Sequence, residues 1–188
     1  CGLTWMSTGQ LGMARRVMRR AVDTLAPAVA AGLPVVVLEP SCAAALRDDL
    51  PPVLAGAARA AAVAAGIRTF AELLDEQATG WAPPAVDAAA VVQTHCHQHS
   101  VLGFDADRRL LARAGIDATV LDAGCCGLAG NFGFERAHYP VSMAVGELAV
   151  LPAVRSAGAD TLVIADGVSC RLQTEHGTRR RAHHVDEV

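Results

Sequence analysis

Two adjacent cysteines, Cys125 and Cys126, stand in a glycine-rich segment of the chain. Gly127, Gly130 and Gly133 follow them. Glycine lets the backbone adopt positive φ and approach a bound object closely, because it has no Cβ atom. Thiols crowded onto such a turn are costly to a protein unless something uses them. The pattern therefore predicts a bulky inorganic ligand held by thiolates and by backbone N–H groups.

Each of three predicted strands is followed by one or two cysteines. Cys96 follows the strand 88–94, Cys125 and Cys126 follow the strand 118–121, and Cys170 follows the strand 162–164. The carboxyl ends of parallel strands meet at one edge of a sheet, where open α/β sheets bind ligands. Four thiolates at such an edge are the ligand set that a [4Fe–4S] cluster requires.

Zinc is the main alternative, because thiolates also select zinc and copper(I). Structural zinc sites usually take two thiols from a C-x-x-C turn, and the sequence has no such motif. Adjacent ligands such as Cys125 and Cys126 fit poorly around one small ion but can reach two corners of a cluster. The spacing therefore favours iron–sulfur over zinc.

Two further interpretations need no metal. The cysteines can simply pack as small apolar side chains in a structural or docking domain. Alternatively, Cys125 acts with Cys42 or Cys170 in thiol–disulfide chemistry, which requires an exposed thiol of low pKa.

Four neighbours of the cysteines are candidates for tuning the potential of a cluster by donating to it. They are His95, His97, Arg171 and the amide of Gly127. We find no nucleophile–base pair and no phosphate-binding G-x-G-x-x-G after a strand, so no residue is assigned a catalytic role. The chain is expected to carry electrons rather than to transform substrate.

The chain repeats itself. Cys1-Gly2-Leu3 matches Cys126-Gly127-Leu128, and the Ser-Cys pair at Cys42 matches the one at Cys170. Such periodicity predicts duplicated structure. We expect a first copy over 1–78, a linker over 79–87 and a second copy over 88–188. The first copy lacks an upstream strand and cysteines, so we expect the chain to be a fragment of a longer protein, cut short at both ends. Cys1 and Cys42 are then the ligands that remain of a first site.

Apolar spacing predicts the elements that position these residues. Helices are expected over 10–31, 43–49, 69–77, 107–114 and 141–157, with Pro152 breaking or restarting the last. Thr69 and Glu72 form a predicted capping box. The unbroken apolar run 35–38 predicts a strand buried on both faces. Strands alternate with helices, which predicts a parallel α/β arrangement of two repeated βαβ units.

Composition excludes several classes of protein. The net charge is −3, which does not indicate nucleic-acid binding. No apolar run is long enough to span a membrane. Six cysteines, two of them adjacent, suit a reducing compartment better than a secreted disulfide framework. The expected location is the cytoplasm, with peripheral attachment at the inner membrane as an alternative.

These motifs resemble the cysteine-rich CCG domain. The phrases that carry the resemblance are LEPSC, HCHQ, GCCGLAGNFGFE and ADGVSCR, which end at or surround Cys42, Cys96, Cys126 and Cys170. The domain occurs in the B subunit of heterodisulfide reductase, in iron–sulfur subunits of glycolate and lactate oxidation, and in FAD-linked oxidases. The chain looks most similar to the C-terminal part of FAD- and iron–sulfur-binding oxidoreductases of the D-lactate and D-2-hydroxyglutarate dehydrogenase type.

The resemblance implies a function that spans more than this chain. In such proteins an FAD domain oxidises a 2-hydroxy acid, a CH–OH donor, and ferredoxin-like clusters with the CCG region pass electrons to an acceptor. The FAD and ferredoxin-like domains would lie upstream in the same polypeptide, and this fragment alone would not be catalytic. One departure is that Glu39 and Gly167 stand where heterodisulfide reductases carry the first cysteine of a C-x-x-C. That departure counts against a noncubane cluster and disulfide cleavage.

Overall fold

The computed structural model describes residues 1–78 and 80–188. The chain divides into two compact units, which we call unit 1 (Cys1–Leu73) and unit 2 (Leu74–Val188). The division lies upstream of the predicted linker 79–87, whose first residue is outside the described part of the chain. The rest of that linker contains no helix or strand. Whether the two units are copies of one repeat stays a prediction.

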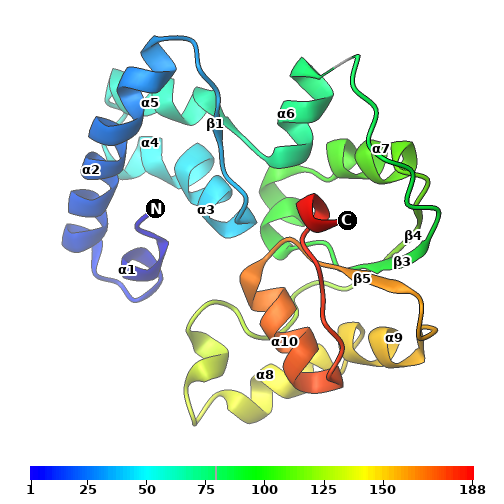
Figure 1. The fold of residues 1–188 in the computed structure, drawn as a ribbon. Coiled ribbons are helices and arrows are strands. Elements are labelled where there is room, and N and C mark those ends of the chain that lie inside the picture. Colours follow the sequence, from blue (N-terminus) through cyan, green and yellow to red (C-terminus); the bar gives the residue numbers. More distant parts are fainter. Residues whose placement is uncertain (79) are drawn as a thin grey trace. The chain divides into compact units, whose positions relative to one another are not determined.

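Unit 1 is mostly helical (Figure 1). Its elements are α1 (Leu3–Ser7), α2 (Leu11–Ala30), β1 (Val35–Val36), α3 (Pro40–Ala44), a π-helical turn (Ala45–Asp49), α4 (Leu50–Val53), α5 (Ala58–Gly66), β2 (Ile67–Arg68) and the start of α6 (Phe70–Gln77). The predicted long helix is confirmed as α2. Its buried residues Ala14, Met18 and Val22 recur every four positions and so form one stripe. Burial of this stripe stabilises α2, although many of the other residues of the helix are alanine or arginine.

The first predicted strand differs from expectation. Only Val35 and Val36 form β1, which pairs in parallel with β2. Val36 is 37% exposed and Leu38 49% exposed, so the prediction of a strand buried on both faces is wrong. The physical reason is that burial of a face requires other elements packed over the sheet, and the packing over this two-stranded sheet leaves these side chains open to solvent.

The helix predicted over 43–49 is longer than expected. Helical structure begins at Pro40 and continues through the π-helical turn and α4 to Val53. Pro40 occupies a position at the start of α3, where its missing N–H costs nothing. The carboxylate of Glu39 accepts hydrogen bonds from the amide and the hydroxyl of Ser41, at 3.4 and 2.8 Å. This cap fixes the backbone on which Cys42 stands.

The predicted capping box at the start of α6 is confirmed. The Thr69 amide donates to Glu72 Oε2 at 2.8 Å, and the Glu72 amide donates to Thr69 Oγ1 at 3.3 Å. Arg47 also donates to both oxygens of the Glu72 carboxylate, at 3.0 and 2.6 Å. One side chain therefore joins the end of unit 1 to the helical segment that follows Cys42.

We predict that Glu72→Gln lowers the stability of unit 1 by about 1 kcal/mol at pH 7, as expected of a charge-assisted hydrogen bond. Burial raises the pKa of Glu72, but hydrogen bonds from Arg47 and from the Thr69 amide outweigh it, so the pKa lies below its ordinary value of 4.5. A depressed folded-state pKa adds stability above the unfolded-state pKa, and that stability is lost as the pH falls through the folded-state pKa. Urea unfolding at pH 7 should show the difference between the two proteins, and the difference should disappear at a pH below the folded-state pKa of Glu72. The variant Asp48→Asn, which neutralises an exposed carboxylate in unit 1, is the control, and an equal loss in both variants would contradict the assignment.

Unit 2 is built on a parallel sheet. Its elements are the end of α6, β3 (Ala89–Val92), a π-helical turn (Gln98–Leu102), α7 (Asp105–Arg113), β4 (Asp117–Val120), a 3-10 turn (Phe132–Phe134), α8 (Tyr139–Gly146), α9 (Val150–Ser156), β5 (Leu162–Ile164), α10 (Val168–Thr178) and a 3-10 turn (Val185–Glu187). The strands lie in the order β4-β3-β5, and both pairs are parallel. Val91 stands opposite Thr119 on one side and Val163 on the other. The predicted parallel α/β class is confirmed, and the repeat is not tested.

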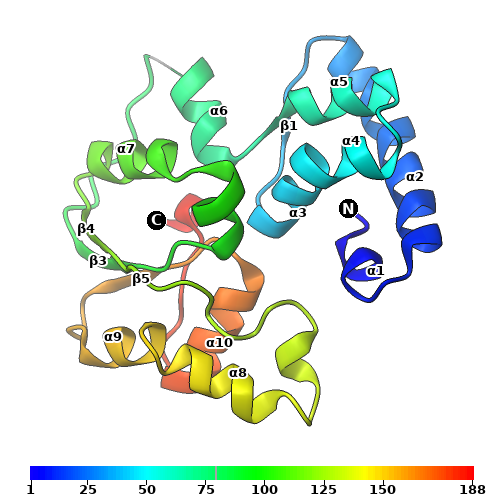
Figure 2. The ribbon, with the colours of Figure 1, turned by 180° about the vertical axis from the view of Figure 1, so that it is seen from behind.

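Helices cover both faces of this sheet. In the two opposite views, α7 lies on one face and α8, α9 and α10 lie on the other (Figures 1 and 2). The helix predicted over 141–157 is two helices, α8 and α9, and of the two roles expected for Pro152 the structure agrees with restarting, since the break follows Gly146. Pro152 lies in the first turn of α9, where proline is tolerated because the N–H that it lacks has no partner in the helix.

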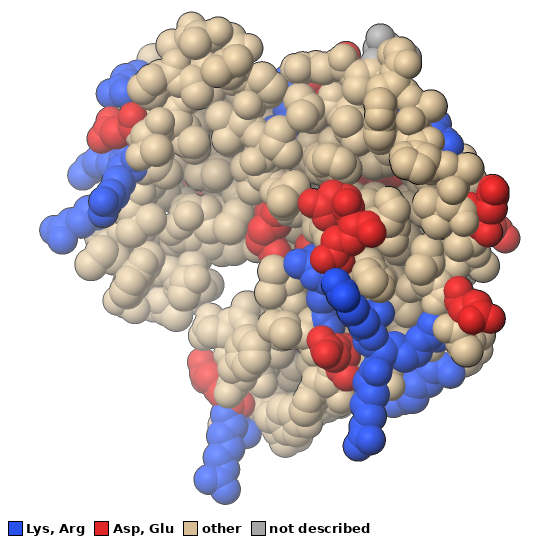
Figure 3. Space-filling view, in the orientation of Figure 1, with Lys and Arg blue, Asp and Glu red and all other residues tan. Residues whose placement is uncertain are grey.

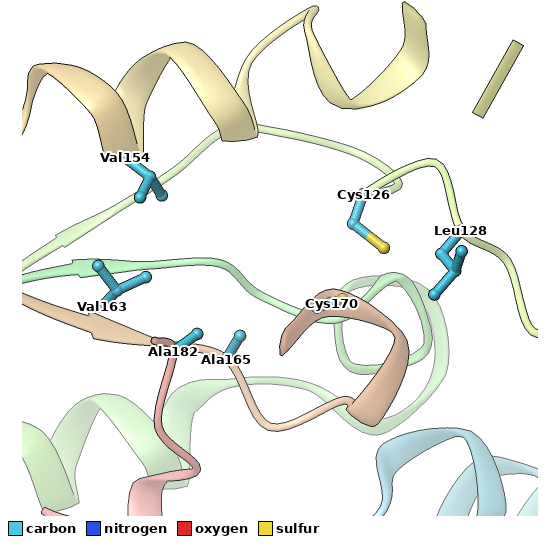
Figure 4. Packing of buried hydrophobic residues seen from close by; sticks show 7 residues of the cluster. All are labelled: Cys126, Leu128, Val154, Val163, Ala165, Cys170 and Ala182. Carbon is cyan, nitrogen blue, oxygen red and sulfur yellow. The ribbon is translucent and has the colours of Figure 1, made fainter. Parts of the chain in front are cut away.

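A buried cluster joins the sheet to the helices of the second face. Its members are Cys126, Leu128, Val154, Val163, Ala165, Cys170 and Ala182, each at most 5% exposed. Figure 4 shows Cys126 on the loop after β4 and Cys170 on α10 at one end of this cluster. Two of the predicted ligands are therefore placed by the hydrophobic core itself.

Charge is dispersed over the surface. In the view of Figure 3 the basic side chains form separate groups with acidic side chains beside them, and no continuous basic face is present on this side. In the described part of the chain, no helix combines the length and the apolar character needed to cross a membrane.

Candidate metal centre

Four thiols meet at the carboxyl edge of the sheet in unit 2. Cys125 interacts with Cys126 and with Cys96, and Cys126 interacts in turn with Cys170. Cys96 follows β3, Cys125 and Cys126 follow β4, and Cys170 follows β5 on the first turn of α10. The sheet order puts β3 in the centre, so the three loops start from adjacent strand ends. The predicted convergence is therefore present in the structure.

The thiols are electrostatically coupled. Hydrogen bonds from Cys126 and from Cys96 hold the pKa of Cys125 far below its usual value. The pKa of Cys96 is raised by its hydrogen bond to Cys125, by burial and by the charges of Cys125 and Cys170. Hydrogen bonds to Cys125 and Cys170, together with burial, raise the pKa of Cys126. Thiolates this close together repel one another, so several of them need a positive charge among them.

Gly127 shapes the loop and contributes a donor. Its φ is +97°, and a Cβ atom at this position would stand 2.1 Å from the carbonyl oxygen of Ser142 in α8. Its amide donates to Cys125 Sγ at 3.3 Å. Only glycine can adopt this φ without strain and also let the loop approach the helix this closely. The predicted amide donor beside the cysteines is present.

A buried glutamine holds the loop that carries Cys125. Gln93 is 2% exposed, and its Nε2 donates to the carbonyls of Thr94, Ala123 and Gly124 at 2.9, 3.4 and 3.3 Å. Its Oε1 is buried without a hydrogen-bond partner in the described part of the chain. Sequence reasoning missed this residue, although a glutamine inside the apolar run 88–94 was a signal.

A second buried glutamine holds the loop that carries Cys96. Gln98 Oε1 accepts from the His95 amide at 3.0 Å, and Nε2 donates to Asp166 at 2.7 Å and to Asp107 at 3.4 Å. Asp166 also accepts from the Val185 amide at 3.0 Å. This network ties the loop after β3 to the loop after β5, so it sets the distance between Cys96 and Cys170.

We predict that Gln98→Ala destabilises unit 2 by about 2–4 kcal/mol, because the His95 amide and the buried carboxylate of Asp166 both lose a partner. Urea unfolding followed by circular dichroism measures the loss. The neighbouring variant His99→Ala removes an exposed side chain and is expected to stay within about 0.5 kcal/mol of the parent. A Gln98→Ala protein as stable as His99→Ala would show that the network does not hold the loops.

The two histidines beside Cys96 stack on each other. Their ring centroids lie 5.2 Å apart with 13° between planes, and both Nδ1 atoms are 3.9 Å from Cys96 Sγ. His95 Nδ1 accepts the His97 amide at 3.1 Å, so this nitrogen acts as an acceptor. The ring of His95 also fills the space beside Gly167, where a Cβ would stand 2.2 Å from it. His95 therefore positions Cys96.

Arg171 lies one residue after Cys170, and its side chain extends toward the end of β5. Its Nη1 donates to the carbonyls of Ala165 and Asp166 at 3.0 and 2.5 Å. These contacts close the turn between β5 and α10. In this conformation Arg171 fixes the start of the helix that presents Cys170.

The remaining two cysteines pair with each other in unit 1. Cys1 Sγ and Cys42 Sγ lie 3.0 Å apart. Burial raises the pKa of the Cys42 thiol. All six predicted ligands thus lie beside other thiols, four in unit 2 and two in unit 1. That they bind metal stays a prediction.

Known proteins similar to this chain are oxidoreductases. The C subunit of anaerobic glycerol-3-phosphate dehydrogenase from Escherichia coli K12 is 33% identical over 195 residues, which cover 98% of this chain and 47% of that protein. D-2-hydroxyglutarate dehydrogenase of Pseudomonas putida KT2440 is 26% identical over 184 residues, which cover 96% of this chain and 17% of that protein. No family model matches the chain. A search of solved structures found no significant match.

The similarity supports the oxidoreductase part of the prediction. The chain spans about half the length of the glycerol-3-phosphate dehydrogenase protein and a smaller share of the hydroxyglutarate enzyme. Both relatives are named for dehydrogenation, so the similarity is to dehydrogenases and their subunits. The activity of any longer protein that contains this chain belongs to the proposal below.

Proposed function

We propose that unit 2 holds a [4Fe–4S] cluster and passes electrons within a flavin-dependent dehydrogenase that oxidises a CH–OH donor such as a 2-hydroxy acid. The single observation that carries this proposal is the meeting of Cys96, Cys125, Cys126 and Cys170 at one sheet edge. The similarity to two dehydrogenases supports the reaction class.

The residues fit such a group by their chemistry. Soft thiolates are the ligands that iron–sulfur clusters take. Thiolates packed this closely repel one another, so iron cations would supply the positive charge that the four sulfurs need. The amide of Gly127 already points at Cys125 Sγ, and amide donors near cluster sulfurs raise the potential. When bound, the cluster would accept and release single electrons.

The residues around the thiols would hold this site in place. Gln93 fixes the loop of Cys125, Gln98 with Asp166 fixes the loop of Cys96, and Arg171 fixes the turn before Cys170. A site whose ligands are positioned before binding needs little rearrangement when its charge changes. Low rearrangement suits electron transfer.

The proposed partners are domains outside this chain. An FAD domain and ferredoxin-like clusters of the same longer polypeptide would deliver electrons, and an acceptor would remove them. The proposed location is the cytoplasm, including peripheral attachment at the inner membrane. Cys1 and Cys42 would complete a further site only together with ligands from an upstream segment.

Anaerobic purification tests the proposal. The expected result is a brown protein with iron and acid-labile sulfide in equal amounts, and charge-transfer absorption that bleaches on reduction with dithionite. A colourless protein that contains one zinc ion per chain would overturn it.

Zinc is the second candidate, and one observation favours it. The ligand atoms of His95, Cys96 and His97 all lie within 4.8 Å of one another. However, His95 Nδ1 already accepts the His97 amide, and three consecutive ligands fit a tetrahedral ion poorly. Metal analysis of the His97→Ala variant separates the candidates, because a zinc site of this kind would lose its metal whereas the proposed cluster would remain.

A further inference from the structure

The sulfur atoms of Cys1 and Cys42 lie closer together than the distance that two non-bonded atoms prefer. They lie 3.0 Å apart, whereas even two carbon atoms prefer about 3.5–4.0 Å. Two thiolates on one tetrahedral zinc ion, each about 2.3 Å from the metal, would stand about 3.8 Å apart. A disulfide bond is about 2.0 Å long. The separation therefore lies between that of shared ligands and that of a covalent bond.

Both cysteines are held in place by their own segments. Gly2 adopts φ +89°, and a Cβ atom there would stand 3.0 Å from Met18 Cγ, so Cys1 is seated against α2. The Cys42 amide donates to the Glu39 carbonyl at 3.0 Å within the capped start of α3. The short distance thus follows from packing on both sides, and little chain movement is needed to join the sulfurs.

Unit 1 offers these thiols no further ligands. Among its residues, all of which the structure describes, no third histidine, cysteine or carboxylate completes a metal-binding group with Cys1 and Cys42. Both thiols are partly exposed, so a small oxidant can reach them. A touching pair of reachable thiols is suited to covalent pairing.

We infer that Cys1 and Cys42 form a reversible intramolecular disulfide when the chain meets a low-molecular-weight disulfide such as oxidised glutathione. The thiolate of one cysteine attacks a glutathione sulfur, forms a mixed disulfide and releases one glutathione thiolate. The second cysteine, as thiolate, then attacks the protein sulfur of the mixed disulfide and displaces the second glutathione. The two cysteines lose two electrons and two protons in total, and one oxidised glutathione becomes two reduced molecules. This inference does not depend on the metal centre of unit 2.

The positions of arginine make the product simple to detect. Cleavage after arginine leaves every cysteine-bearing segment separate, namely 1–15, 21–47, 69–108, 114–136 and 156–171. The 188-residue protein is freed of metal, incubated with oxidised glutathione, quenched in acid, alkylated and digested. The expected product is peptide 1–15 joined to peptide 21–47 and lighter by two hydrogens, and a thiol reductant should separate them. Recovery of both peptides alkylated, or of either one joined to a peptide of unit 2, would overturn the inference.

Single variants give the matched control. In Cys1→Ser and Cys42→Ser the remaining cysteine should stop at the glutathione adduct, because no second thiol is present to resolve it. In the unaltered chain the adduct should be scarce, since the neighbouring thiol displaces glutathione quickly. Adducts equally abundant in the unaltered chain and in the variants would contradict the pairing.

Thermal unfolding provides an independent measurement. A bond across 41 positions of sequence restricts the unfolded chain, so oxidation should raise the melting temperature of unit 1 by roughly 10 °C or more. The Cys42→Ser protein treated with oxidised glutathione should show no such rise. An unchanged melting temperature in the oxidised, linked protein would mean that the bond strains the fold and is not accommodated as inferred.

Discussion

The Cys125→Ser protein is expected to bind less than about one tenth of the iron of the unaltered chain, because Cys125 is the thiol that interacts with both Cys126 and Cys96. Loss of this sulfur removes one ligand and the contacts that Cys125 makes with Cys126 and Cys96. Cys125 is only partly buried, so the substitution should cost little packing. Iron and sulfide analysis after anaerobic reconstitution measures the effect, and thermal unfolding shows whether the fold persists.

The matched control for this prediction is Cys42→Ser, which makes the same chemical change in unit 1. It should leave the iron content and the reduction potential of the centre in unit 2 nearly unchanged. Equal iron content in Cys125→Ser and in the unaltered chain would remove Cys125 from the ligand set. Equal loss in both variants would mean that the loss does not report on a ligand of unit 2.

Local patterns predicted most of the fold because their causes are local. The stripe of α2 and the capping box of Thr69 and Glu72 depend on residues three or four positions apart. The apolar runs before Cys96 and Cys170 became adjacent parallel strands, as expected of buried α/β sheets. These features need no knowledge of the rest of the chain.

Features set by distant contacts were not predicted. The burial of β1 depends on which elements pack around it in the folded chain. The apolar residues of its own segment do not determine that burial, and β1 pairs with β2 in a small sheet. Likewise, the sequence left open whether Pro152 breaks or restarts the helix, and the structure places it in the first turn of α9. In both cases the tertiary environment, which composition does not reveal, decided the outcome.

At the candidate site, too, features with local causes were predicted and features set by distant contacts were not. Placing thiols at strand ends predicted which cysteines of unit 2 would meet, because parallel strands end at one edge. The residues that hold them escaped prediction. Gln98 and Asp166 are 68 positions apart, and the type of neither residue indicates which residue it will bond to. A polar side chain in or directly after an apolar strand, as at Gln93, is the signal that a search for such supports can use.

Replacing Gly127 with alanine should destabilise unit 2 by at least about 3 kcal/mol and should prevent formation of the metal centre. An alanine at φ +97° costs about 1–2 kcal/mol in backbone strain. Its Cβ would also stand 2.1 Å from the Ser142 carbonyl oxygen, which belongs to the backbone of α8 and cannot rotate away. The loop must then withdraw from α8 and carry Cys125 and Cys126 with it.

Gly124→Ala is the matched control, because it makes the same change three residues earlier in the same loop. A Cβ at Gly124 meets nothing within 4 Å, and its φ is outside the left-handed region. This variant should stay within about 1 kcal/mol of the parent, since the added methyl group mainly restricts the unfolded chain. Urea unfolding and iron uptake should therefore separate the two variants. If they unfold alike and take up iron alike, then the close approach of the cysteine loop to α8 does not hold the thiols together, and the preformed site described above is lost with it.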